Sequence, residues 1–262
     1  MKKLFSIFAV VAMVLTLSPQ SASALTSYSQ LQAGDLIRGE SFSAVYYYGK
    51  DGFRYVFPND KTYFTWYDNF DNVKFLSDAD LAQIQIGGNA TYRPGIRMIK
   101  INSDPKTYAV GEGGSLHWVT SESVAISLYG SAWNTMIDDV PDAFFSNYQK
   151  GADIEEADDF DPANETSSAT DINNDKDLKF PTVVNISDDM YDQETVTINA
   201  GTVVKWTNNG TNKHTATADN LKWGTGTLQN SQSFSRYFDT PGTYTYFCSY
   251  HPDTMHGTLI VQ

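Results

Sequence analysis

From Phe180 to the C-terminus the chain consists of short alternating apolar and polar runs, and this pattern limits the fold more than any other feature. Turn sequences such as Asn199-Ala200-Gly201 and Thr240-Pro241-Gly242 separate the runs. No helical period lies between them, so residues 179–262 are predicted to form an all-β Greek-key sandwich of about eighty residues. The expected strands are 182–186, 194–198, 202–206, 214–218, 232–238, 243–247 and 258–261.

Residues 34–154 contain one pattern twice, with a period of about sixty residues. The first copy consists of 36–38 and 44–57, and the second of 98–100 and 107–119. In each copy, aromatic and β-branched runs flank a glycine-containing turn, which predicts a β-hairpin. A helical pattern follows each hairpin, with Ser77 and Ser121 as capping residues. We therefore expect residues 25–152 to form one α+β domain of two hairpin-helix repeats. Its tyrosines and tryptophans are expected to be half-buried hairpin residues rather than a sugar-binding surface.

Between residues 153 and 177 there are ten acidic residues and one lysine. Self-repulsion predicts an extended acidic linker over 153–178. Within it, Asp171, Asn173, Asp175 and Asp177 alternate as in a calcium-binding loop. Lys176 stands where such loops need glycine, and no glutamate follows at the twelfth position, so a plain linker is the preferred interpretation.

The first 24 residues have two lysines, an apolar run over 4–17 and a small-residue segment ending at Ala24. This pattern predicts a secretory signal peptide that is cut after Ala24. No stretch is long enough to predict a membrane span. The mature protein is thus expected outside the cytoplasm, in the extracellular space, periplasm or cell surface, with the repeat domain as a candidate link to the cell envelope. A net charge of −13 argues against nucleic acid as a partner.

Cys248 is the one cysteine of the chain, so an internal disulfide is excluded. In an exported protein its thiol is free, intermolecular or ligated, and ligation explains why it is tolerated. His251 and Met255 follow within one short loop, and His214 lies upstream in a strand-like run. Each alone would be an ordinary core residue. Together, two imidazoles, a thiolate and a thioether form the ligand set of a blue copper electron-transfer site.

Two longer segments carry a resemblance to a known family. These are Val203-Val204-Lys205-Trp206-Thr207-Asn208-Asn209, leading to His214-Thr215, and the stretch from Gly242 through Cys248-Ser249-Tyr250-His251-Pro252 to Val261. They resemble the plastocyanin and amicyanin branch of the cupredoxins. The resemblance implies a β-sandwich that holds one type 1 copper and transfers single electrons to a redox protein. The partner itself is not identified by the sequence.

The resemblance also implies a role for each residue of the site. His214, Cys248 and His251 are equatorial ligands, Met255 is the axial ligand, and Thr215 and Ser249 support the cysteine loop. His251 with Pro252 is the candidate electron port. Three residues separate His251 from Met255, whereas plastocyanins have four and amicyanins two, which makes the strength of the axial bond the open point. His256 is an alternative, harder ligand, and His117 is interpreted as structural.

Three functions remain for comparison. The preferred one is an exported electron carrier whose repeat domain is a tether or docking module. A multicopper oxidase is disfavoured because the chain has only four histidines, and a binuclear copper centre would need a second cysteine. The alternative is a non-redox copper-binding protein, or a surface adhesion or cell-wall-binding protein.

Overall fold

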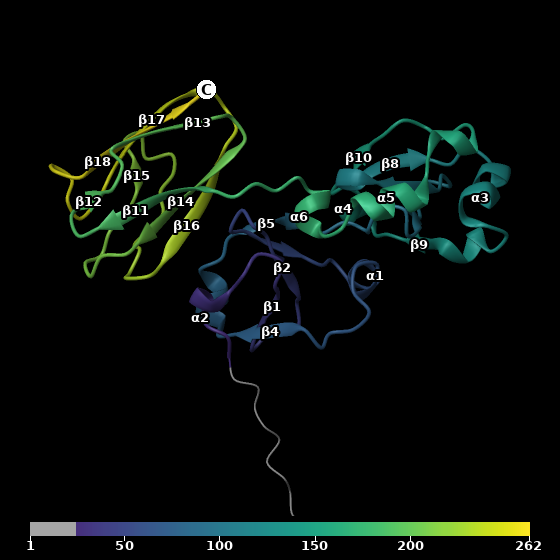
Figure 1. Ribbon diagram of the computed structural model, residues 1–262, viewed down its shortest axis with the longest axis horizontal. Helices are drawn as coiled ribbons and strands as arrows, with labels where there is room; N and C mark the ends of the chain where they lie inside the picture. The colour runs from purple at the N-terminus through teal and green to yellow at the C-terminus, as the bar shows by residue number, and fades with distance from the viewer. Residues whose placement is uncertain (1–24) are drawn as a thin grey trace, which may run out of the picture.

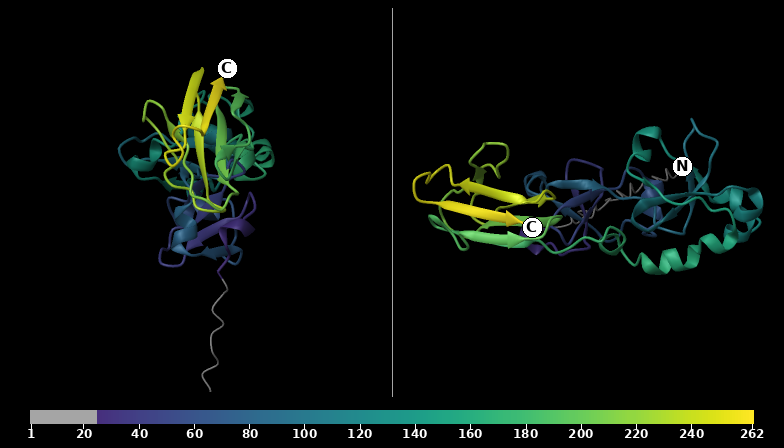
Figure 2. Two further views of the ribbon diagram at one scale, coloured as in Figure 1. Left: turned by 90° about the vertical axis from the view of Figure 1, so that its left-hand side faces the viewer. Right: turned by 90° about the horizontal axis from the view of Figure 1, so that it is seen from above.

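The computed structural model describes residues 25–262, so the predicted signal peptide lies outside the described residues. Figure 1 shows three parts: a first sheet near the middle, a second sheet at one end, and a sandwich that contains the C-terminus at the other end. Seen from above in Figure 2, the parts form an elongated row. Within the described range, no helix has the length and apolar character needed to cross a membrane.

The first sheet is mixed, with strand order β4-β1-β2-β3-β5. Strands β1, β2 and β3 are antiparallel neighbours, β4 is parallel to β1, and β5 is parallel to β3. The hairpin tyrosines Tyr47 and Tyr55 are almost fully buried in its core. The elements are β1 (Leu36–Gly39), β2 (Tyr46–Tyr48), β3 (Arg54–Val56), α1 (Asp60–Phe64), β4 (Val73–Leu76), α2 (Asp78–Ala82) and β5 (Ile86–Asn89).

The second sheet has the order β10-β8-β7-β6-β9. Strands β6, β7 and β8 are again antiparallel neighbours, with β9 parallel to β6 and β10 parallel to β8. The elements are β6 (Met98–Lys100), β7 (Tyr108–Gly111), β8 (Ser115–Trp118), α3 (Glu122–Tyr129), β9 (Ile137–Asp139), α4 (Asp142–Phe145) and β10 (Gln149–Lys150).

Both predicted capping serines begin helices. The Ser77 side chain accepts a hydrogen bond from the Asp80 N–H ahead of α2, and the Ser121 side chain accepts one from the Val124 N–H ahead of α3. The predicted hairpin-helix unit nevertheless leaves out two strands of each sheet. Those strands are only two to four residues long and follow the helical segments, where no alternating pattern is long enough to indicate them.

The segment predicted as an extended acidic linker is instead helical, and this prediction was wrong. It contains α5 (Pro162–Ser168) and α6 (Ile172–Asp175), which begin at the capping residues Asp161 and Asp171. The physical reason is burial: the segment carries apolar side chains that enter the cores of the two sheets, and its acids cap helices or face solvent. The buried side chains are Ile154, Phe160, Ala169, Ile172 and Leu178.

The residues that alternate as in a calcium-binding loop lie in the same segment, and three of their side chains accept hydrogen bonds from backbone N–H groups of the protein. Asp171 accepts a hydrogen bond from the Asn174 N–H at 2.8 Å. Asn173 accepts one from the Lys50 N–H at 2.8 Å. Asp175 accepts one from the Gly113 N–H at 2.9 Å. These contacts join α6 to both sheets.

The C-terminal part is the predicted sandwich, made of two four-stranded sheets with the orders β12-β11-β14-β16 and β13-β18-β17-β15. Its core holds Trp206, which is fully buried among other aromatic rings. The strands are β11 (Thr182–Ser187), β12 (Met190–Tyr191), β13 (Thr195–Ile198), β14 (Thr202–Asn208), β15 (Thr217–Ala218), β16 (Ser233–Phe238), β17 (Gly242–Phe247) and β18 (His256–Val261).

One outer face of the sandwich contacts the first sheet. The ring of Tyr237 in β16 stacks on Phe53 at 5.2 Å between centroids, and Val203 in β14 is buried in the core of the first sheet. Asp51 has no exposed surface and accepts hydrogen bonds from the hydroxyls of Tyr237 at 2.9 Å and Tyr55 at 2.6 Å. A buried carboxylate therefore links the two parts.

Candidate metal centre

Cys248 lies immediately after β17, where the chain leaves the sheet for a short loop. Its N–H donates to the Met255 carbonyl at 3.0 Å, and the His251 N–H donates to the Cys248 carbonyl at 3.0 Å. The Met255 N–H in turn donates to the His251 carbonyl at 3.1 Å. These backbone bonds close the loop so that it begins and ends at the same point of the sheet.

His214 comes from the segment before β15 and is fixed by its main chain. It forms an isolated antiparallel bridge with Leu228: the His214 N–H donates to the Leu228 carbonyl at 3.2 Å, and the reverse bond is 2.8 Å. The predicted strand 214–218 is therefore shorter in the structure, where β15 covers two residues. His214 is still held opposite Cys248, because β15 pairs with the end of β17.

The three donor side chains meet at the end of the sandwich. Cys248 Sγ lies 3.7 Å from His214 Nδ1 and 3.7 Å from His251 Nδ1. All three ligand atoms lie within 4.8 Å of one another, and within residues 25–262 no other histidine, cysteine or acidic residues form such a group. Metal bonds of about 2.0–2.1 Å to nitrogen and about 2.3 Å to sulfur in a trigonal plane would separate sulfur from nitrogen by about 3.8 Å. The triangle thus fits a trigonal metal ion.

Burial and the nearby His251 hold the pKa of His214 below its usual range, with burial the larger cause. A lower pKa favours the neutral imidazole, which is the form that binds metal. Its Nδ1 faces the thiol and its Nε2 lies 3.8 Å from Asp188 Oδ1. The Asp189 N–H also points at this Nε2, at 3.5 Å, so the turn that contains Asp188 and Asp189 holds the outer edge of the His214 ring.

Thr215 connects the His214 segment to the cysteine loop. Its N–H points at Cys248 Sγ at 3.4 Å, and its hydroxyl oxygen accepts the Ser249 N–H at 2.8 Å. The Thr215 and Ser249 hydroxyls are 3.3 Å apart. Because an N–H that points at sulfur stabilises negative charge there, these contacts support a thiolate as well as the shape of the loop.

Sequence reasoning missed four residues around the site. Thr217 Oγ1 contacts the hydroxyls of Thr215 and Ser249, and the Tyr191 hydroxyl donates to the Thr215 carbonyl at 2.6 Å. Asp188 and Asp189 form the turn between β11 and β12 and face the two histidines. The Asp188-Asp189 pair marks a turn in the sequence, but nothing in the sequence places that turn beside residues 214 and 251.

The remaining predicted residues, Met255, His256 and His117, lie in different environments. Met255 is 1% exposed and packs in the sandwich core with Cys248. His256 is exposed, on the side of the chain opposite to the buried Met255, because successive residues of a strand point to opposite sides. The structure therefore does not support His256 as a substitute ligand. His117 is structural, as predicted: its Nδ1 contacts the Ala152 carbonyl and its Nε2 the Ser115 hydroxyl, both at 2.9 Å.

Comparison with known proteins identifies the family of this domain. A model of the cupredoxin-like domain matches residues 165–261. A plastocyanin from Scenedesmus fuscus is 34% identical over 85 residues, which cover 28% of this chain and 87% of that protein. The chain belongs to the cupredoxin family. An amicyanin-alpha from Methylorubrum extorquens is also 34% identical over 89 residues, covering 31% of this chain and 71% of that protein.

A solved amicyanin structure from Paracoccus versutus shares 31% identity over 31% of this chain and 81% of that chain, with a TM-score of 0.29. The match to the cupredoxin-like domain begins within α5, ahead of the sandwich. The cofactor of this cupredoxin is one type 1 copper, and His214, Cys248 and His251 are placed to form its ligand site. The donor set agrees with the cofactor, since thiolate and imidazole ligands suit copper.

Proposed function

We propose that this cupredoxin is an exported electron carrier that passes single electrons to and from a redox protein. The observation that carries the proposal is the triangle of Cys248 Sγ, His214 Nδ1 and His251 Nδ1, which the protein's own hydrogen bonds hold together. Export is inferred from the pattern of residues 1–24 and agrees with a lone cysteine that is a ligand. The electron donor and acceptor are proposed to be proteins of the same compartment.

His214, Cys248 and His251 are the proposed equatorial ligands, and Met255 is the proposed axial ligand. Bound copper supplies a one-electron couple between its two oxidation states. The protein limits rearrangement of the ligands: His214 is held in a β-bridge, the cysteine loop closes on itself at Met255, and Thr215 bonds both the Cys248 sulfur and the Ser249 N–H. A site whose ligands move little exchanges electrons with a small reorganisation.

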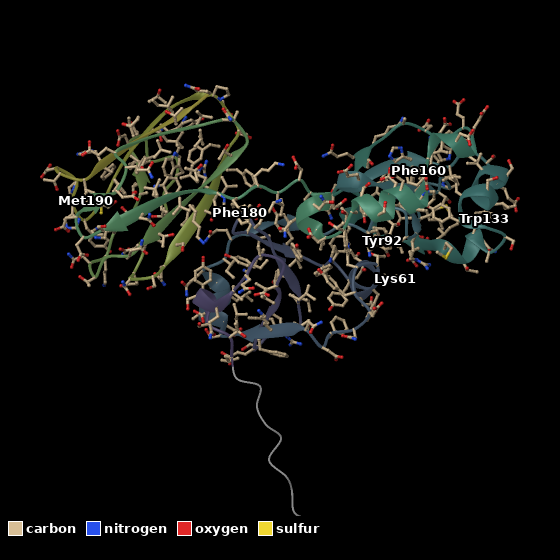
Figure 3. All side chains as sticks on the ribbon, viewed as in Figure 1. Lys61, Tyr92, Trp133, Phe160, Phe180 and Met190 are labelled. Atoms are coloured by element: carbon tan, nitrogen blue, oxygen red, sulfur yellow. The ribbon has the colours of Figure 1, made fainter. Side chains whose placement is uncertain are left out.

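The proposed electron port is His251 with Pro252. His251 is 29% exposed and Pro252 is exposed, whereas His214 and Cys248 have no exposed surface. Figure 3 labels Met190, which follows the Asp188-Asp189 turn, at the end of the sandwich away from the two N-terminal sheets. A redox protein can therefore approach the exposed edge of His251 without meeting the N-terminal part.

Residues 25–152 are the proposed tether or docking module, and two hairpin-containing units are its proposed repeats. Support comes from the matching strand connections of the two five-stranded sheets. Further support comes from the contact between the first sheet and the sandwich, which leaves the ligand end of the sandwich free. Such a module would hold the copper domain at the cell envelope while its port faces outward.

Visible absorption of the copper-loaded protein tests the proposed site. We expect one copper per chain and an intense thiolate-to-copper band. Cys248→Ser removes the thiolate and abolishes the band. Met255→Leu keeps the volume of the core and the band, because it removes only the weak thioether ligand. Asp219→Asn, an exposed substitution outside the ligand loop, is the control and should match the wild-type spectrum.

Two results would contradict the proposal. One is a colourless copper complex of the wild-type protein, which would favour a non-redox copper-binding protein. The other is a Cys248→Ser variant with an unchanged band, which would place the copper elsewhere.

A further inference from the structure

The exposed nitrogen of His251 contacts a carboxylate. His251 Nε2 lies 3.0 Å from Asp189 Oδ1, within the distance of a strong hydrogen bond. A carboxylate only accepts, so the nitrogen that faces it carries the proton, and Nδ1 keeps its lone pair on the side of Cys248. The edge of the proposed port therefore lies in close contact with an acidic side chain.

The turn that carries Asp189 is held firmly against the sandwich. The neighbouring Asp188 carboxylate accepts hydrogen bonds from the Thr211 N–H at 2.7 Å, the Thr211 hydroxyl at 2.8 Å and the Asn212 N–H at 2.8 Å. Gly210 approaches the same turn so closely that a Cβ there would lie 2.8 Å from the Asp188 nitrogen. The contact to His251 thus belongs to an anchored turn.

Asp189 also has an unfavourable backbone conformation, with φ of 66°. Non-glycine residues adopt this left-handed region at a cost, although aspartate and asparagine tolerate it better than most. Glycine would satisfy this turn without a side chain. The residue present instead directs a carboxylate at the proposed ligand His251.

Resting on the proposed function, we propose that Asp189 is a positioning residue that orients His251 and lowers the reduction potential of the copper site. A carboxylate that accepts the imidazole N–H makes the other nitrogen a stronger donor, and it fixes the plane of the ring. Both the stronger donor and the nearby negative charge favour the more highly charged, oxidised ion over the reduced one. Removal of Asp189 should therefore raise the potential.

Three variants separate the hydrogen bond from the charge alone. Asp189→Gly removes the acceptor and suits the positive φ, and Asp189→Asn keeps a neutral acceptor in the same conformation. Asp253→Asn removes an equal charge from an exposed position two residues after His251 and serves as the control. We expect Asp189→Gly to weaken the preference for the oxidised ion about tenfold, which is about 59 mV for one electron. Asp189→Asn should shift the midpoint potential less, and Asp253→Asn least.

A second readout does not depend on the redox couple. In the zinc-loaded protein the His251 Nε2–H should give a slowly exchanging NMR signal, which Asp189→Gly should lose and Asp253→Asn should keep. The proposal would be overturned if the midpoint potentials of both Asp189 variants matched that of the Asp253→Asn control. Rapid exchange of the His251 Nε2 proton in the wild-type protein would also overturn it. Absence of a reversible couple in the wild-type protein would instead contradict the proposed electron carrier, and the zinc experiment would still decide the hydrogen bond.

Discussion

Asp175 shows how one buried acid ties the N-terminal part together and what that costs. Asp175 is 3% exposed, and its Oδ1 accepts a hydrogen bond from the Gly113 N–H. Its Oδ2 has no hydrogen-bond partner within the described chain, and the buried hydroxyl of Thr91 also lacks one there. Burial, more than any neighbouring charge, raises the pKa of Asp175 from 3.8 to about 6.

The raised pKa predicts a pH dependence of stability. Between about pH 4 and pH 6 the folded protein binds a proton that the unfolded chain lacks, so the free energy of unfolding falls as pH rises through this window. Asp175→Asn keeps an acceptor for Gly113 and removes the charge. It should raise the free energy of unfolding by about 3 kcal/mol at pH 7.5 and by almost nothing below pH 4.

Urea denaturation of the metal-free protein from pH 4 to pH 8 measures this difference. The control is Asp171→Asn, because asparagine is an equally good helix cap and Asp171 is exposed. A stability gain from Asp175→Asn that does not change with pH would show that the carboxyl is not the titrating group.

The residues of the metal site differed in how far the sequence predicts them. His214, Cys248 and His251 could be predicted, because their chemistry is rare and the cysteine count limits the alternatives. Asp189 could not be predicted. Its role depends on tertiary packing, which places the turn beside His251 although the two lie 62 positions apart in the sequence. An acidic turn alone is an ordinary surface feature.

Among the elements, the ligand loop between β17 and β18 depends on Thr215 for its shape. The Thr215 hydroxyl accepts the Ser249 N–H, and Thr217 contacts both hydroxyls. The loop and the His214 segment are therefore one unit before any metal binds.

Replacement of the Thr215 hydroxyl tests this unit. Thr215→Val has nearly the same shape but leaves the Ser249 N–H without its acceptor, so we expect a loss of about 1 kcal/mol in the metal-free protein. Amide exchange at Ser249 should become faster in the same variant. Ser249→Ala keeps the N–H and is the matched control; equal exchange rates in the two variants would contradict the role given to Thr215.

Seven of the eight sandwich strands could be predicted to within a few residues because their alternation is long, as in β14 and β16. The exception is β12, which has two residues. The helices at 157–175 could not, because the density of acids indicated an extended chain. Their apolar residues, Phe160 and Ile172 among them, are too widely spaced to form a helical stripe, yet each enters a core. The burial of these separate apolar side chains outweighed the repulsion between the acidic residues.

At the scale of the whole molecule, Tyr237 makes two of the contacts between the first sheet and the sandwich. Its ring stacks on Phe53 and its hydroxyl donates to the buried Asp51. A stacked aromatic pair contributes about 0.5–1.5 kcal/mol and a hydrogen bond to a charged group about 1.5–3 kcal/mol. The contact is therefore strong enough to couple the unfolding of the two parts.

Tyr237→Ala should uncouple them. We expect calorimetry to show one transition for the first sheet and the sandwich in the wild type and two in the variant, with about 2–4 kcal/mol of docking free energy lost. The control is Leu221→Ala, a substitution of a side chain that is 73% exposed. A single transition in the Tyr237→Ala variant would mean that other contacts, such as Val203, hold the parts together.

The electron-carrier proposal is tested most directly by potential-controlled absorption of the copper-loaded wild-type chain. The structure predicts that the thiolate-to-copper band disappears and returns through one reversible one-electron couple, with one copper per chain, because the ligand triangle is already formed by the protein. A band that is absent, or one that is lost irreversibly on the first reduction, would contradict an electron carrier.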